Sequence, residues 1–433
     1  CASNIGSAVA RFYGGKFAWP TFQASLVQNL PAIDFSSEII DKIRRYIDEE
    51  VNNRRKAFQS CEPFQEFTLP TELHSIKDES TSWNISSLLG KELENIIASC
   101  YGLNSDQLAE LERDISEAVS IRGNKEIVED GSSPDNDELS VELIEQTSED
   151  KAAGLLSYSL GCCFGRWDIR IAVDPSLAPK LPGPFDALPV CPPGMLVGPD
   201  GLPAKSGSIV SEEWLRARPN AVTIPHDDAV KNPTITDTEY PLHISWNGIL
   251  VDDEGHPEDI VGRVREAMEV IWKDKAGDIE QETCEILGVQ SLRDYFRRPS
   301  HFFADHLKRY SKSRRQAPIY WPISTPSGSY TLWLYYHRLT DQTLYTCVND
   351  FIEPKLKQVA ESAARLRQKT DRSRAEEREL ERLMDLELEL RDFRDELLKI
   401  ASFWKPNLND GVQITAAPLW KFFRHTPWQR KLK

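Results

Sequence analysis

Residues 319–339 read IYWPISTPSGSYTLWLYYHRL and decide the fold of this chain. Residues 319–324 and 330–339 are rich in β-branched and aromatic residues, and the segment between them contains a proline and a glycine, which favour a turn. The sequence therefore predicts a β-hairpin. Because Pro322 has no backbone N–H to donate, we expect its strand at the edge of a sheet.

The second strand of this hairpin carries large side chains on both faces. Strand side chains alternate between faces, so Leu332 and Leu334 share one face, and Trp333 and Tyr335 share the other. Both faces are apolar or amphipathic. We expect one face to pack on the core and the other to meet a ligand or a helix.

A cluster of basic residues stands directly before the hairpin. The segment 308–315 contains five bases and no acid, whereas the whole chain has a formal net charge of -16. A polyanion-binding surface needs clustered Lys and Arg, so the overall charge argues against nucleic acid while this cluster argues for it. Two more basic clusters lie at 42–56 and 421–433, and the acidic excess is concentrated at 103–150, which holds 15 acids and 3 bases.

Several ordered runs carry a family resemblance. They are LGCCFGRWD at 160–168, LG at 287–288 leading into LRDYF at 292–296, RRQAPIYW at 314–321 and LYYHR at 334–338. In this order they resemble segments of large single-chain adenine-specific DNA methyltransferases, namely the PglX-type enzymes of BREX phage-defence loci and their type IIG-like restriction-modification relatives. The resemblance covers roughly residues 17–356 and identifies the family better than the member.

The resemblance implies that this chain is the C-terminal target-recognition and scaffolding part of such an enzyme. Its partners are then double-stranded DNA, a preceding methyltransferase domain that binds S-adenosylmethionine, and other proteins of the defence system. The catalytic motifs of the family are absent: Asn232-Pro233-Thr234 is the nearest match to Asn-Pro-Pro-Tyr/Phe, and no glycine-rich cofactor loop follows a strand. We therefore predict no catalytic, cofactor-binding or metal-binding residue within this chain.

Seven residues are candidates for DNA contact under this resemblance. Arg and Lys supply most phosphate and base contacts, and residues 1–31 resemble the end of a target recognition domain. A solvated turn explains the two basic residues of that segment equally well, and packing in the core is the favoured interpretation of the two aromatics. In order of preference the candidates are Arg314, Arg315, Lys312, Arg11, Lys16, Trp321 and Tyr330.

Two other functions are weighed against DNA recognition. Pro134-Asp135 followed by Glu149-Asp150-Lys151 has the spacing of a metal-dependent nuclease site. This segment is acidic and poor in aromatics, so a chance match is the favoured interpretation. The other alternative is a protein-interaction scaffold of a defence complex that makes no direct contact with DNA.

Length, hydropathy and cysteine content bound the class of protein. The 433 residues exceed one typical domain. No apolar run is long enough to cross a bilayer, no signal-peptide pattern is present, and the eight cysteines include no Cys-x-x-Cys pair. We expect a cytoplasmic protein with reduced thiols, and, because it begins at Cys1, a fragment of a longer polypeptide.

The expected fold class is α+β and mostly helical, with small mixed β-hairpins and sheets, helical bundle regions and one long heptad helix. Six segments are predicted from the composition shifts. They are 1–60, the end of a target recognition region plus a helix; 61–122, a helical region; 123–150, an acidic linker; 151–353, an α+β domain with a proline-rich excursion at 175–241; 354–405, a coiled-coil or spacer helix; and 406–433, a basic and aromatic tail.

Apolar repeats define the two longest predicted helices. One begins near Ser36 or Ser37, with Ile40, Ile43, Ile47 and Val51 on its expected buried face. The other, of nearly fifty residues, fills 354–405, where apolar residues recur at alternating spacings of three and four. A spacer between DNA-contacting modules and a dimerisation arm both fit it. Its heptad residues are Leu383, Leu386, Leu390, Phe393, Leu397 and Ile400.

Overall fold

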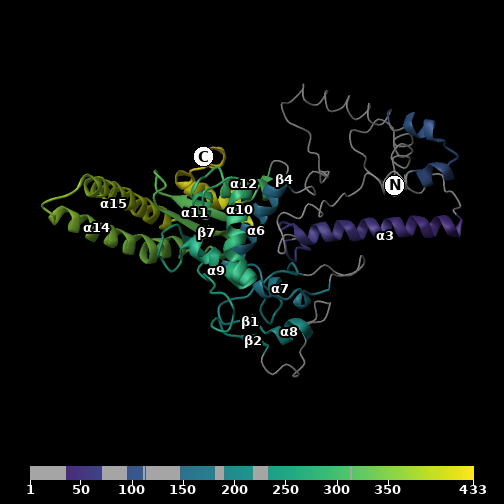
Figure 1. Cartoon of the computed structure of the whole chain (residues 1–433), viewed down its shortest axis with the longest axis horizontal. Helices are drawn as coiled ribbons and strands as arrows, with labels where there is room; N and C mark the ends of the chain where they lie inside the picture. The colour runs from purple at the N-terminus through teal and green to yellow at the C-terminus, as the bar shows by residue number, and fades with distance from the viewer. Residues whose placement is uncertain are drawn as a thin grey trace. The chain divides into compact units, whose positions relative to one another are not determined.

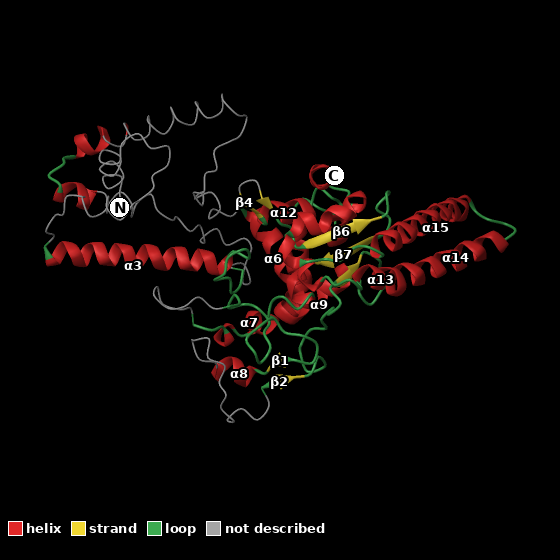
Figure 2. Ribbon diagram, turned by 180° about the vertical axis from the view of Figure 1, so that it is seen from behind, coloured by secondary structure: helices red, strands yellow, loops and turns green. Residues whose placement is uncertain are grey.

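The structure is a computed structural model that describes residues 36–70, 95–110, 113, 147–180, 190–217, 233–312 and 315–433. The chain divides into two compact units, one made of residues 1–57 and 80–145, the other of residues 58–79 and 146–433. Within the described residues the fold is α+β and mostly helical, with small antiparallel sheets, as the sequence predicts (Figure 1 and Figure 2).

The central sheet of the second unit contains the predicted hairpin. Strands β6 (Tyr320–Ser324) and β7 (Thr331–Tyr335) pair antiparallel, and β3 (Ile249–Val251) adds to the other side of β7. The strand order β3-β7-β6 puts β6 at the edge, which confirms the position expected from Pro322. Gly328 adopts φ +77° in the connecting turn, a conformation that glycine reaches without strain.

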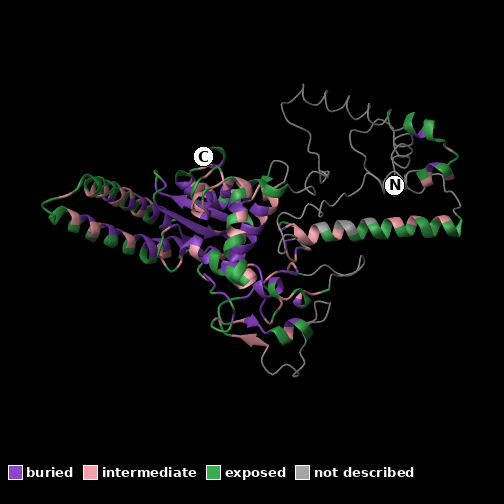
Figure 3. Cartoon of the chain, viewed as in Figure 1, coloured by how far each residue is buried: buried purple, intermediate pink, exposed green. Residues whose placement is uncertain are grey.

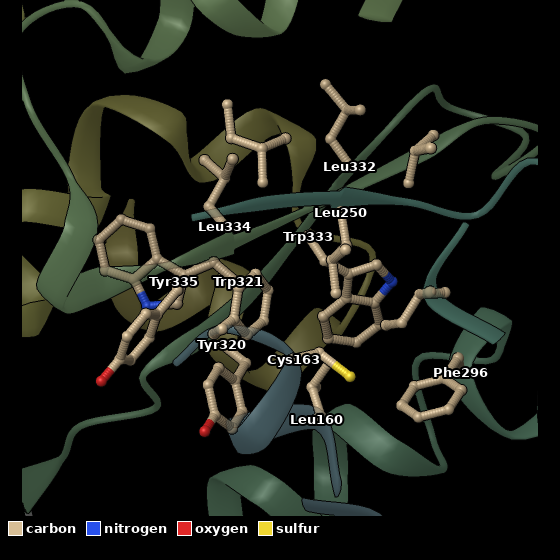
Figure 4. Packing of buried hydrophobic residues seen from close by; sticks show 14 of the residues in the cluster. Leu160, Cys163, Leu250, Phe296, Tyr320, Trp321, Leu332, Trp333, Leu334 and Tyr335 are labelled. Atoms are coloured by element: carbon tan, nitrogen blue, oxygen red, sulfur yellow. The ribbon is translucent and has the colours of Figure 1, made fainter. Parts of the chain in front are cut away.

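Helices cover both faces of this sheet. On one face, Phe164 stacks on Tyr320 and Tyr335, with ring centroids 5.5 and 5.4 Å apart. On the other face, Tyr330 donates its hydroxyl hydrogen to the Phe351 carbonyl at 3.0 Å. All five residues of β7 are buried, and Figure 4 shows Leu332 and Leu334 on the side of the strand opposite to Trp333. Both faces of this strand therefore pack against the interior of the protein, and Figure 3 shows the sheet in the buried colour.

The other elements follow in chain order. The helices are α3 (Ser37–Ser60), α6 (Ser148–Cys163), α7 (Ile169–Val173), α8 (Glu212–Ala217), α9 (Ile260–Trp272), α10 (Ala276–Ile286), α11 (Leu292–Arg297), α12 (Phe302–Arg309), α13 (Thr343–Thr346), α14 (Glu353–Gln368), α15 (Arg374–Ala401), α16 (Val412–Ala416) and α17 (Thr426–Leu432), with a π-helical segment at Cys347–Ile352. The remaining strands are β1 (Ile209–Val210), β2 (Thr234–Ile235), β4 (Ser311–Lys312) and β5 (Arg315–Gln316).

The single helix predicted over 354–405 is wrong, because two helices occupy this range. Helices α14 and α15 lie side by side as an antiparallel hairpin (Figure 1). The break has a local cause: Ser373 caps α15 by accepting from the Glu376 N–H at 3.3 Å, and the Glu376 carboxylate accepts from the Ser373 N–H at 2.8 Å. This capping box favours a new helix start over continuation. The predicted heptad lies on α15, with Leu390 and Leu397 fully buried.

Helix α3 is confirmed, but its apolar face is not buried as expected. Ile40, Ile47 and Val51 are 43%, 48% and 36% exposed. The 3.6-residue spacing correctly identifies a helix, yet it cannot tell whether a partner covers the apolar face. Among the described residues, no helix combines the length and the apolar character needed to cross a bilayer.

Candidate nucleic-acid interface

The basic cluster 308–315 forms the end of α12 and a short antiparallel hairpin, β4–β5. Its register pairs Ser311 with Gln316 and Lys312 with Arg315. Arg315 is exposed to solvent. This register places two basic residues at directly opposite strand positions, an arrangement in which like charges disfavour the pairing of the strands.

Contacts from both sides fix the position of β5. The Ala317 N–H donates to the Tyr310 carbonyl at 2.9 Å, which closes the base of the hairpin. From the C-terminal region, Gln413 Nε2 donates to the Gln316 carbonyl at 3.2 Å, and Lys431 Nζ lies 3.3 Å from Gln316 Oε1. The hairpin is therefore held against α12, α16 and α17.

Two of the five bases in the cluster serve the fold. Lys308 Nζ lies 3.1 Å from Asp150 Oδ1 at the start of α6. The Arg309 side chain is only 17% exposed and donates to the backbone carbonyls of Asp150 and Ala153 at 3.2 and 3.3 Å. These contacts tie α12 to α6. Lys308 stays 76% exposed while it pairs with Asp150, and Arg315 is exposed on β5.

The motif LGCCFGRWD takes part in a buried polar network that reaches Tyr310, the residue before β4. Glu62 is 6% exposed and accepts hydrogen bonds from Ser157 Oγ at 2.6 Å, Arg166 Nη1 at 2.8 Å and Trp167 Nε1 at 3.1 Å. Arg166 also donates to the Tyr310 hydroxyl. Burial raises the pKa of Tyr310, so its phenol stays neutral. This motif of the resemblance thus contributes to the buried interior of the fold.

The end of the motif forms a second buried ion pair. Arg170 Nη2 lies 2.8 Å from Asp168 Oδ2, and Arg170 Nε donates to Asp168 Oδ1 at 2.9 Å. The hydroxyl of Tyr240 donates to the same carboxylate at 3.2 Å. Because both charges are paired and hydrogen-bonded, the pair can be buried without an uncompensated charge.

His306 joins α12 to the start of β6. Its Nε2 accepts hydrogen bonds from the backbone N–H groups of Ile319 at 2.9 Å and Tyr320 at 3.1 Å. An accepting Nε2 places the ring proton on Nδ1. Burial, followed by the nearby charges of Arg309 and Arg166, lowers the pKa of His306 well below its usual value. The neutral imidazole therefore has a structural role: it accepts the two backbone hydrogen bonds that connect α12 to the start of β6.

The structure separates the predicted contact residues into three groups. Arg315 is exposed on β5, and Lys312 lies in β4. Arg11, Lys16 and Arg314 lie outside the described residues. The two aromatic candidates, Trp321 and Tyr330, form the third group and lie in the core.

The stacking roles considered for Trp321 and Tyr330 do not fit the structure. The two residues are 0% and 1% exposed. Trp321 Nε1 donates to the Pro318 carbonyl at 2.7 Å, and the Tyr330 hydroxyl is engaged by Phe351. Since neither ring reaches the surface, the core interpretation favoured by the sequence is the correct one.

The nuclease-like pattern does not assemble in the described residues. Asp135 lies outside them, and Glu149 and Asp150 lie in the first turn of α6. Partial burial alone would raise the pKa of Asp150, but hydrogen bonds from Lys308 and Thr147 outweigh this effect and lower that pKa. That carboxylate is thus used in a helix cap and an ion pair. Among the described residues, no group of three or more His, Cys, Asp or Glu side chains is placed to hold a metal ion.

Comparison with known proteins identifies a distant relative. No family model matches the chain. The chain is similar to a protein named adenine-specific methyltransferase BrxX, from Escherichia coli O9:H4 (strain HS), with 24% identity over 348 residues. The similar region covers 75% of this chain and 24% of that protein, so the chain spans about a quarter of the length of this relative. The similarity supports a relationship between this chain and adenine-specific methyltransferases of the BREX type.

Proposed function

We propose that this chain is the DNA-recognition and scaffolding portion of a site-specific adenine-specific DNA methyltransferase of a phage-defence or restriction-modification system. The observation that carries the proposal is the similarity to an adenine-specific methyltransferase over three quarters of the chain. The basic cluster 308–315 is consistent with it, because this acidic protein concentrates positive charge there and Arg315 is exposed.

The proposal divides the work between this chain and another domain. An adenine must leave the base stack before its amino group is methylated, and this costs a few kcal/mol that contacts to the duplex offset. This chain supplies those contacts. A separate methyltransferase domain binds S-adenosylmethionine and carries out the transfer, because the Asn-Pro-Pro-Tyr/Phe motif is not in this sequence.

The proposed contact residues are the five Arg and Lys residues among the seven candidates from the sequence. Arg315 acts from β5 and Lys312 from β4, and Arg314, Arg11 and Lys16 are kept as contact residues from the sequence. Arg and Lys only donate hydrogen bonds, which suits phosphate oxygens. The buried aromatics are not part of the proposal.

The test is duplex binding by the 433-residue chain and a paired variant. Arg314→Ala with Arg315→Ala removes two positive charges from the basic cluster. We expect weaker binding and a smaller salt dependence, with the slope of log K against log salt reduced by about 1.8. The matched control, Arg365→Ala with Arg367→Ala, removes two exposed arginines of α14. Equal binding by both variants refutes the contact assignment.

A protein-interaction scaffold is the second candidate function. The α14–α15 hairpin favours it, since the hairpin extends from the sheet (Figure 1) and exposes Met384 and Leu388 at 45% and 61%. If the chain fails to bind duplex DNA at low ionic strength but retains a partner protein of the same system, the scaffold function replaces DNA recognition.

A further inference from the structure

Two long stretches of this acidic chain contain no acid. Residues 306–340 hold six bases and no Asp or Glu, and residues 411–433 hold five bases and no Asp or Glu. The whole chain has 68 acids and 52 bases, so stretches of this length without an acid run against its composition. A surface built from both stretches has no acidic side chain of its own to repel a polyanion.

The fold brings these two stretches together. Lys431 Nζ lies 3.3 Å from Gln316 Oε1, across a separation of 115 residues. Below the surface, the rings of Trp321 and Phe423 meet edge to face, with centroids 6.2 Å apart. At the β6–β7 turn, a Cβ on Gly328 would collide with the guanidinium of Arg424. The second stretch therefore packs along the first.

Helix α17 has a rigid attachment although it is short. Trp428 is 0% exposed and Leu432 is 7% exposed, and these residues are four apart, so they anchor one side of the helix in the core. His425 caps the helix by accepting from the Trp428 N–H at 3.3 Å. Arg430 and Lys431, on the same helix, are both exposed.

We infer that α17 and the β4–β5 hairpin form one surface that binds the sugar-phosphate backbone of duplex DNA, with Arg430 and Lys431 as contact residues beside Arg315. This inference rests on the proposed function and adds residues to its site. Contact with phosphates suits these side chains, because contacts to the backbone fix the register of a protein on DNA while base edges give specificity. Rigid anchoring of α17 lowers the entropy lost on binding.

Two nearby bases make contacts of their own within the protein. Lys421 Nζ lies 3.4 Å from Glu396 Oε2 on α15, so its charge is compensated within the protein. Lys433 Nζ lies over the Trp420 ring at 5.2 Å from the centroid, and this contact draws it toward the protein. The residues tested are Arg430 and Lys431, which are both exposed on α17.

The experiment measures duplex affinity of the 433-residue chain over a range of salt concentrations by fluorescence anisotropy. Arg430→Gln with Lys431→Gln removes two charges from α17. The matched control, Arg367→Gln with Lys357→Gln, removes one Arg and one Lys, both exposed, from α14. Circular dichroism verifies that both variants keep their helices.

We expect the α17 variant to lower the slope of log K against log salt by about 1.8, with the control unchanged, because each phosphate contact contributes about 0.9. If the unmodified chain binds DNA and the α17 variant keeps the full slope, the inference about α17 is overturned while the proposed function stands. If the unmodified chain does not bind duplex DNA at low salt, the proposed function fails, and this inference fails with it.

Discussion

Arg166 Nη1 lies 2.8 Å from Glu62 Oε1, although 104 residues separate the two in the chain. Arg309, from the basic cluster, approaches the other oxygen of the same carboxylate at 3.9 Å. One buried carboxylate thus connects the motif GRWD to the helix that precedes the β4–β5 hairpin. The proposed DNA-binding surface depends on this interior contact for its position.

The first prediction concerns this carboxylate. Glu62→Gln leaves Arg166 buried without a compensating charge, and we expect a loss of about 3–5 kcal/mol in the free energy of unfolding, measured by urea denaturation. The control Glu361→Gln changes an exposed residue of α14 and is expected to alter stability by no more than about 0.5 kcal/mol. Equal stability of the two variants contradicts the structural role of Glu62.

The second prediction concerns pH. The pKa of His306 is lowered in the folded state, whereas the unfolded chain binds a proton with a pKa of about 6.5. The unfolded state therefore gains a proton first as pH falls, and stability is lost below about pH 6.5 by up to about 1.4 kcal/mol per pH unit. In His306→Gln this part of the slope disappears. Unfolding free energies measured at several pH values that show the same slope in both proteins refute the prediction.

The third prediction separates the core from the surface. Trp321→Ala creates a cavity in the core and is expected to cost about 3–5 kcal/mol of stability. Arg315 is exposed, so Arg315→Ala is expected to change the free energy of unfolding by no more than about 0.5 kcal/mol. Thermal unfolding without DNA measures both, and a Trp321 variant as stable as the Arg315 variant is incompatible with the buried position of this ring.

The fourth prediction concerns the start of α15. Ser373→Ala removes the cap and is expected to destabilise the helix by about 1 kcal/mol. Amide hydrogen exchange then becomes faster in the first turn of α15. The Glu376 carboxyl takes part in the same cap, and hydrogen bonds from Lys369 and Ser373 lower its pKa to about 2. Unchanged exchange in Ser373→Ala indicates a continuous helix through residue 373.

The sequence predicts local elements well here because their causes are local. The turn residues Pro326 and Gly328 and the alternation in β7 identify the hairpin, and Pro322 identifies its edge strand. The break before α15 also has a local signal, the spacing of Ser373 and Glu376, but the strong heptad that follows outweighed it.

The candidate site was only partly predictable, because it depends on distant partners. The sequence shows five bases at 308–315 but not that Lys308 and Arg309 are engaged by α6. It also cannot show that Lys431 reaches Gln316, a contact between residues that only the complete fold brings together. The sequence does show that both segments lack acids, but not that they meet.

The measurement that tests the central claim most directly is the salt dependence of duplex binding by the unmodified 433-residue chain. The account predicts binding at low ionic strength that weakens linearly in a plot of log K against log salt, between about 50 and about 200 mM. Undetectable binding at the lowest salt concentration, or an affinity that does not depend on salt, contradicts a role for this chain in binding duplex DNA.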